Sequence, residues 1–154
     1  MENIPQHIVL FPDGNRRWAR EKKLPLMIGH TKGYRRIEPT VLHAKKLGIQ
    51  YVTFWAFSTE NWRREPDEVE YLMNIFRRFF KGSMIGRLKK EGARVNVLGE
   101  LERFPEDIQK SMKNVIKETK DNNTITVNIA ISYGGRPEIL RAIREIVKKK
   151  TKNI

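Results

Sequence analysis

The sequence of 154 residues contains no cysteine. Disulfide bonds and zinc sites built on thiolates are therefore excluded. No run of roughly 20 apolar residues is present, so no segment is predicted to span a membrane. The first residues, MENIPQH, lack the basic start and the apolar stretch of a signal peptide, and we expect a cytoplasmic protein. Internal repeats and low-complexity linkers are also missing, which predicts a single domain over residues 1–154.

The excess of basic residues is the most informative feature of the composition. The formal net charge is +13, which favours an anionic partner: nucleic acid, an acidic membrane face or a phosphorylated substrate. We expect no nucleic acid, because zinc-finger spacing, basic heptads and the aromatic signature of ribonucleoprotein domains are all absent. Part of the excess lies in the tail REIVKKKTKN (144–153), which is typical of a solvated helix end.

Apolar runs alternate with helical patterns along the whole chain. The runs predict four strands, at 7–11, 50–58, 94–99 and 124–132, and the first of them is continuous enough for a strand covered on both faces. Helical spacing predicts helices at 38–48, 65–80, 104–119 and 136–149, with Pro39 kinking or restarting a helix that begins near Thr31. The alternation is typical of an α/β fold with a mainly parallel sheet flanked by helices.

The stretch HIVLFPDGNRRW (7–18) places one carboxylate directly after the first predicted strand. Ligands of open α/β sheets bind beyond the carboxyl ends of the strands. Asp13 could hold magnesium, which takes one or two carboxylates and completes its shell with waters and phosphate oxygens. A helix starting near Asn15, with Arg16 and Arg17, could hold the phosphates. A capped turn with an exposed ion pair explains the same residues, so the local sequence leaves both interpretations open.

A second polar stretch, FSTENWRREPDE (57–68), follows the second predicted strand. Its hydroxyl, amide, aromatic and arginine side chains would lie beside Asp13 if the two strands are neighbours, and they suit a phosphorylated apolar substrate. A polar loop that caps the next helix is the alternative. The stretches GHTKG (29–33) and YGGRPE (133–138) are weaker signals, since a lone histidine is usually structural and the second is more typical of a packing turn.

The apolar face of the predicted helix 65–80 also has two interpretations. Leu72, Met73, Phe76 and Phe80 follow helical spacing. Such a stripe is usually part of a core, and it could equally form the wall of a slot for a hydrocarbon chain. The sequence by itself favours the core.

Four motifs together are far more specific than any one of them. H-x5-D-G-N-R-R-W-A, G-H-x-x-G, F-S-T-E-N-W-x-R-x-x-x-E-V and N-I-A-x-x-Y-G-G-R-x-E-I occur in this order between His7 and Lys148. Their order and spacing resemble those of the cis-prenyltransferases, the undecaprenyl diphosphate synthase family. The resemblance implies repeated condensation of isopentenyl diphosphate onto an allylic diphosphate of the farnesyl or geranylgeranyl type, with Mg²⁺, to give polyprenyl diphosphates for glycan carrier lipids. It also implies a hydrophobic tunnel within the parallel sheet and its helices.

The resemblance assigns roles to individual residues. Asp13 matches the magnesium-binding aspartate, and Asn61 matches the residue that helps to remove the proton from the condensing unit. An amide is a poor base, so we expect Asn61 to position a substrate oxygen or a water that accepts the proton. The substrate-binding residues that the resemblance implies are Gly14, Asn15, Arg16, Arg17, Trp18, His30, Ser58, Thr59, Glu60, Trp62 and Arg64.

The sequence departs from the family pattern in two places. Leu26 stands where the family usually has a substrate-binding arginine, so one diphosphate contact is missing unless Lys22 or Lys23 replaces it. Family members also continue beyond the last helix into an R-T-x-G-E-x-R-x-S-N-F type motif and a late glutamate, whereas this chain stops at Ile154. We therefore expect the allylic site to be present, the isopentenyl site to be incomplete and the last strands of the sheet to be missing.

These departures leave more than one functional hypothesis. The leading one is a cis-prenyltransferase domain that forms a homodimer, or a heteromer with a chain that supplies the missing segment, and that touches the membrane surface peripherally. The alternatives are a subunit of a heteromeric or split prenyltransferase and a prenyl-diphosphate-binding relative that is inactive in elongation by itself.

Overall fold

The computed structural model describes residues 3–150, so the parts of the predicted domain and basic tail at residues 1–2 and 151–154 lie outside the described residues. Four strands alternate with helices along the chain. In order, the elements are β1 (His7–Leu10), α1 (Asn15–Glu21), α2 (Leu26–Tyr34), α3 (Ile37–Lys46), β2 (Tyr51–Ser58), the 3₁₀ helix η1 (Thr59–Arg63), α4 (Pro66–Lys81), α5 (Ser83–Lys90), β3 (Ala93–Leu98), the 3₁₀ helix η2 (Leu101–Arg103), α6 (Glu106–Thr119), β4 (Ile125–Tyr133) and α7 (Gly135–Lys150).

All four strands are parallel and form one sheet in the order β1-β2-β4-β3. The α/β fold with a parallel sheet flanked by helices is therefore confirmed. The carboxyl ends of β1 and β2 are neighbours, with Leu10 paired to Phe54. This pairing brings the two polar stretches that follow these strands to the same edge of the sheet, as the sequence predicted.

The two faces of the sheet differ in polarity. Alternate residues of β4, among them Ile125, Val127 and Ile131, are 2% exposed or less and join one core with residues from α3, α4, α5 and α6. The opposite face carries a row of hydrogen-bonded polar side chains, in which Asn128 donates to Thr53 at 3.0 Å and accepts from Asn96 at 3.1 Å. The core therefore lies on one side of the sheet.

The first strand is less covered than predicted. Its residues alternate between exposed and half-buried, and Val9 is 49% exposed. Within residues 3–150, β1 is covered on one face, because Ile8 and Leu10 pack against the core while Val9 points to the polar side. The prediction of a strand was therefore correct, but the prediction that both of its faces are covered was wrong within residues 3–150.

The helix patterns were confirmed with two corrections. The helix predicted to begin near Thr31 begins earlier, as α2 at Leu26, and the restart predicted at Pro39 lies at Arg35 and Arg36, before α3. Pro39 lies in the first turn of α3, where its missing N–H breaks no intrahelical bond. The second correction is α5, which the sequence did not predict; it has only eight residues, and they include Gly86, which has a low helix propensity.

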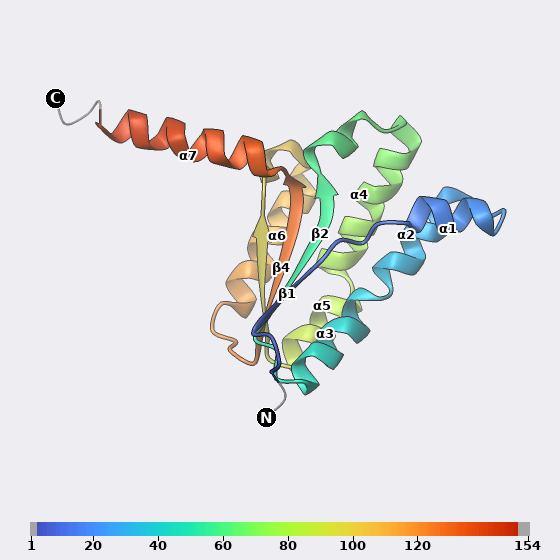
Figure 1. Cartoon of the computed structure of the whole chain (residues 1–154), viewed down its shortest axis with the longest axis horizontal. Coiled ribbons are helices and arrows are strands. Elements are labelled where there is room, and N and C mark those ends of the chain that lie inside the picture. Colours follow the sequence, from blue (N-terminus) through green and yellow to red (C-terminus); the bar gives the residue numbers. More distant parts are fainter. Residues whose placement is uncertain (1–2, 151–154) are drawn as a thin grey trace.

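The last helix stands apart from the others. Figure 1 shows α7 extending away from the sheet and the other helices, beyond the end of β4. Several of its apolar side chains are exposed, including Ile139 at 62% and Ile146 at 57%. No helix within residues 3–150 is long and apolar enough to cross a membrane.

Candidate active site

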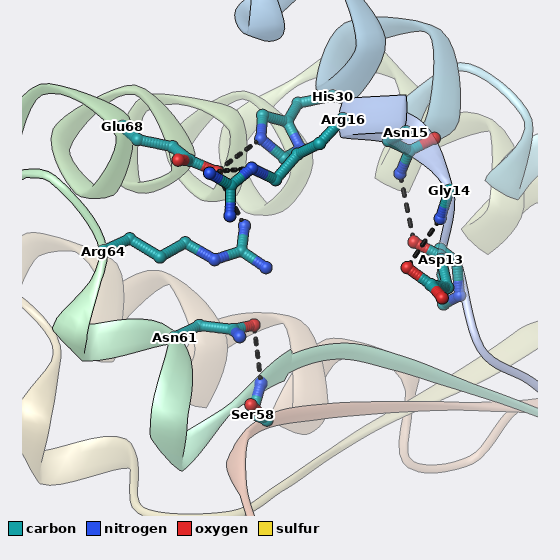
Figure 2. Close-up of polar contacts among 10 residues, drawn as sticks. Asp13, Gly14, Asn15, Arg16, His30, Ser58, Asn61, Arg64 and Glu68 are labelled. Atoms are coloured by element: carbon teal, nitrogen blue, oxygen red, sulfur yellow. Dashed lines mark hydrogen bonds and ion pairs between the residues drawn. The ribbon is translucent and has the colours of Figure 1, made fainter. Parts of the chain in front are cut away.

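The turn between β1 and α1 forms the first part of the site. Asp13 is exposed, and its Oδ1 accepts a hydrogen bond from the backbone N–H of Gly14 at 2.6 Å. Gly14 has a φ of 82°, in the left-handed region that favours glycine. The side chain of Asn15 donates from Nδ2 to the carbonyl oxygen of Pro12 at 3.1 Å. The turn therefore presents one carboxylate beside the first residues of α1 (Figure 2).

Two glycines of α2 allow α1 to pack closely against it. A Cβ atom added to Gly29 would lie 2.1 Å from the carbonyl oxygen of Asn15, and one added to Gly33 would lie 2.7 Å from the Asn15 side chain. Contacts this short do not occur between real atoms, so larger residues would push the helices apart. The G-H-x-x-G motif thus sets the distance between α1, which carries Arg16 and Arg17, and α2, which carries His30.

The segment after β2 forms the second part of the site. The backbone N–H of Ser58 donates to Oδ1 of Asn61 at 3.1 Å, which fixes the start of η1. Both residues line the same cavity as Asp13. Because the oxygen of the Asn61 amide is used within the loop, its NH₂ group is the part left to contact a ligand.

Glu68 connects three basic side chains that come from three other segments. Its Oε1 lies 2.9 Å from Nε2 of His30, 2.9 Å from Nη1 of Arg64 and 3.7 Å from Nε of Arg16. Glu68 is only 4% exposed, and His30 is 8% exposed. Figure 2 shows these side chains converging on the Glu68 carboxylate from α1, α2 and the end of η1.

The charges of this cluster follow from its surroundings. Burial raises the pKa of Glu68, but the hydrogen bond from His30 and the nearby Arg64 and Arg16 charges outweigh burial and leave that pKa below its usual value. Burial also lowers the pKa of His30, against the opposing effect of Glu68. At neutral pH the carboxylate is therefore ionised and the imidazole neutral, with Nε2 as the donor to Oε1.

One arginine in this cluster is incompletely satisfied. Nε of Arg16 is buried and has no hydrogen-bond partner among the residues that the structure describes. Its 3.7 Å distance to Glu68 is within the range of an ion pair but too long for a hydrogen bond. The Arg16 side chain as a whole is 41% exposed and lines a cavity, so its terminal nitrogens keep capacity to bind an anion.

A cavity of about 670 Å³ joins these parts of the site. Its polar end has four arginines and a single carboxylate, that of Asp13; its other end is apolar and is lined by Tyr34, Ile37, Leu72, Ile75, Phe76, Phe79 and Ile129. Leu72, Phe76 and Phe79 also belong to the core cluster. The stripe of α4 is thus both core and cavity wall, so the two interpretations of its apolar face were not exclusive.

Nine of the thirteen predicted site residues line this cavity, and they are Asp13, Gly14, Asn15, Arg16, Arg17, His30, Ser58, Asn61 and Arg64. The other four, Trp18, Thr59, Glu60 and Trp62, are not among its lining residues. The indole of Trp62 packs against Phe57 and Phe104, and its Nε1 donates to Oγ of Ser132 at 2.9 Å. These contacts hold Trp62 against the core, where it supports the loop.

Sequence reasoning did not identify Arg20 or Glu68. Arg20 lines the polar end of the cavity, whereas Lys22 and Lys23 are exposed and are not among the lining residues. Arg20 is therefore a further cation at the cavity, in addition to the predicted Arg16, Arg17 and Arg64. Glu68 had a visible signal: it is the second glutamate of the F-S-T-E-N-W-x-R-x-x-x-E-V motif, four residues after Arg64.

Comparisons with known proteins concern the family and the fold of the chain. The family model described as undecaprenyl diphosphate synthase matches residues 11–154. The chain belongs to this family. It is 42% identical over 147 residues to an isoprenyl transferase of Clostridium perfringens, and 39% identical over 148 residues to a farnesyl-diphosphate-specific ditrans,polycis-undecaprenyl-diphosphate synthase of Lactiplantibacillus plantarum. Each match covers 96% of this chain but only 58% and 57% of those relatives. The chain thus spans a little over half of their length.

A solved structure in the family is also closely similar. Lavandulyl diphosphate synthase from Lavandula x intermedia, in complex with dimethylallyl diphosphate, superposes with a TM-score of 0.95 at 29% identity. The match covers 100% of this chain and 66% of that one. The recognition of the family from its four motifs is therefore confirmed, as is the fold that the family implies. The roles of the individual site residues remain predictions.

Proposed function

We propose that this chain binds an allylic diphosphate in the cavity and serves cis-prenyl chain elongation with isopentenyl diphosphate, giving polyprenyl diphosphate for glycan carrier lipid. One observation carries the proposal: a single cavity joins an end with four arginines to an apolar wall. Arginine forks bind phosphate oxygens, and the apolar wall suits a hydrocarbon chain. Farnesyl or geranylgeranyl diphosphate has both parts in one molecule.

The reaction would use these residues as follows. The carbon–oxygen bond of the allylic diphosphate breaks, and its diphosphate leaves with the electron pair. The double bond of isopentenyl diphosphate supplies the electrons for the new carbon–carbon bond, and a proton is then lost. Arg16, Arg17 and Arg64 line the cavity where the leaving group would gain negative charge, which such donors stabilise. The NH₂ group of Asn61 would orient the oxygen that accepts the proton.

Magnesium is the cofactor that we propose for this site. Residues 3–150 contain no group of three or more His, Cys, Asp or Glu side chains that could hold a metal, so a site made of protein ligands alone does not fit. A magnesium ion held by one carboxylate and completed by waters and substrate phosphates does fit, and Asp13 would be its protein ligand. When bound, the ion would offset the charge of the departing diphosphate.

The alternative is that this chain is one part of a heteromeric or split prenyltransferase. It is favoured by the exposed apolar residues of α7, such as Ile139 and Ile143. Another copy of the chain, or a partner with the remaining segment, would cover them in either case.

We place the protein in the cytoplasm, in peripheral contact with the membrane, because its proposed product is a long lipid.

Calorimetric titration of the chain with farnesyl diphosphate tests the proposal. We expect binding that depends on Mg²⁺ and that is tighter than the binding of inorganic pyrophosphate, because the pyrophosphate leaves the apolar wall empty. Mixing with radiolabelled isopentenyl diphosphate should give negligible polymer from this chain by itself. Absence of magnesium-dependent binding would refute the proposed function, and efficient elongation would exclude the split-enzyme alternative.

A further inference from the structure

We propose that Glu68 is a positioning residue, whose buried carboxylate holds Arg64, Arg16 and His30 together as one anion-binding unit. The inference rests on the proposed function, since the anion is the diphosphate of the substrate. Glu68 itself is not among the residues that line the cavity. It would act through its neighbours and would not touch the substrate.

The geometry supports a role in orientation. The three basic groups come from separate segments: Arg16 from α1, His30 from α2 and Arg64 from the residue that follows η1. Their common partner is a single atom, Oε1 of Glu68, which lies 3.7 Å from Arg16, 2.9 Å from His30 and 2.9 Å from Arg64. All three side chains also line the cavity. Contacts with one fixed acceptor therefore set how these groups are placed relative to one another.

The charge of Glu68 explains why the cluster can exist. At these distances the two guanidinium groups repel each other, and a protonated imidazole would repel both of them. A carboxylate that is 4% exposed is costly to bury unless it is paired. The carboxylate thus offsets the repulsion between the arginines, and the arginines offset the cost of burying the carboxylate. The arginines are therefore held in place before any ligand binds.

Three roles for Glu68 give different results when the carboxylate becomes an amide. If Glu68 acts only through its charge, its removal makes the cavity more positive and tightens diphosphate binding. If Glu68 only stabilises the start of α4, the melting temperature falls while the affinity stays the same. If it positions the arginines, the affinity falls even though a negative charge has been removed.

The variant Glu68→Gln has a matched control in Glu70→Gln. Glu70 lies on the same helix, two residues further on, and is exposed. Both variants lose one negative charge and keep the shape of the side chain. Titration with inorganic pyrophosphate, and with farnesyl diphosphate in Mg²⁺, should show binding about 10-fold weaker in Glu68→Gln, similar to the loss of other orienting partners. We expect no weakening in Glu70→Gln.

A double-mutant cycle tests whether Glu68 acts through Arg64. In an Arg64→Ala background, Glu68→Gln should weaken pyrophosphate binding by much less than in the wild type. Glu68→Asp keeps the charge but is one methylene shorter, so it cannot reach His30 and Arg64 together, and it should bind pyrophosphate more weakly too. This variant carries the test if Glu68→Gln does not fold, as judged by circular dichroism.

The outcomes separate this inference from the proposed function. If the wild type binds farnesyl diphosphate while Glu68→Gln or a folded Glu68→Asp binds pyrophosphate as tightly as it does, the positioning role is wrong and the proposed function stands. Fully additive effects of Glu68→Gln and Arg64→Ala overturn the positioning role as well. If the wild type binds no diphosphate, the proposed function fails and this inference fails with it.

Discussion

The contact between α1 and α2 gives a prediction whose size follows from the structure. In Gly29→Ala, the new Cβ would lie 2.1 Å from the carbonyl oxygen of Asn15, 2.9 Å from its carbonyl carbon and 3.2 Å from Cβ of Ala19. The nearest atoms are backbone and cannot rotate away. Ordinary contact at 3.4 Å or more therefore needs the helices to separate by about 1 Å.

Two energies of opposite sign decide the result. Alanine is better than glycine in a helix by about 1 kcal/mol, and forced separation of packed elements costs about 1–3 kcal/mol. We expect the free energy of unfolding to fall by up to about 2 kcal/mol. Diphosphate binding should weaken more strongly, because the separation moves Arg16 and Arg17 relative to His30, and misplacement by about 1 Å can cost about 100-fold.

Gly86→Ala is the matched control for Gly29→Ala. Gly86 is also inside a helix, α5, but nothing lies within 4 Å of the position of its added Cβ. Urea unfolding should therefore show Gly86→Ala to be about 1 kcal/mol more stable than the wild type, and calorimetry should show unchanged pyrophosphate binding. If the two variants had equal stability and equal affinity, the close approach of α1 and α2 would not control the site.

Two further predictions concern ionisable groups. Asp13→Ala should abolish the Mg²⁺ dependence of farnesyl diphosphate binding, measured by titration with and without EDTA, and a variant that keeps this dependence would rule out Asp13 as the ligand. The second is acid sensitivity: the folded pKa of His30 lies below its ordinary 6.5, so the unfolded chain takes up this proton first. The free energy of unfolding should therefore decrease as the pH falls below 6.5, with a further loss below 4.5 as Glu68, whose folded pKa is also lowered, becomes protonated. His30→Gln should remove the first part of the decrease in urea titrations, and an unchanged pH profile would contradict the assignment.

The sequence predicted the sheet better than it predicted the site. Apolar runs located all four strands to within one residue at each end, because each strand turns alternate apolar residues toward the core. Pro39 indicated a break in this region, but not its position, since Arg35 and Arg36 carry no helix-breaking signal. For Trp62, the family motif gives its position in the chain but not its direction, which the contacts with Phe57 and Ser132 decide.

Glu68 was missed for a different reason. Local patterns describe neighbours in sequence, and Arg64 is one of these, but His30 lies 38 positions away. Only the packing of α2 against α4 shows that one carboxylate serves residues of three segments. A buried acid among cations is therefore a property of the assembled fold and cannot be obtained from the periodicity of one helix.

The carboxylates of Glu68 and Asp13 differ in whether basic groups contact them, and this difference determines what each can bind. Glu68 is buried and uses its Oε1 for three basic groups. Asp13 faces the same cavity as the arginines. Within residues 3–150, however, Asp13 forms no ion pair at 4.0 Å or less, and its Oδ1 accepts a hydrogen bond from the backbone N–H of Gly14. A carboxylate needed to neutralise arginines would sit in contact with them, as Glu68 does. Asp13 instead keeps its oxygens available to a cation, while Glu68 holds Arg16 and Arg64 together. A diphosphate bound by those two arginines would supply the remaining ligands of the cation.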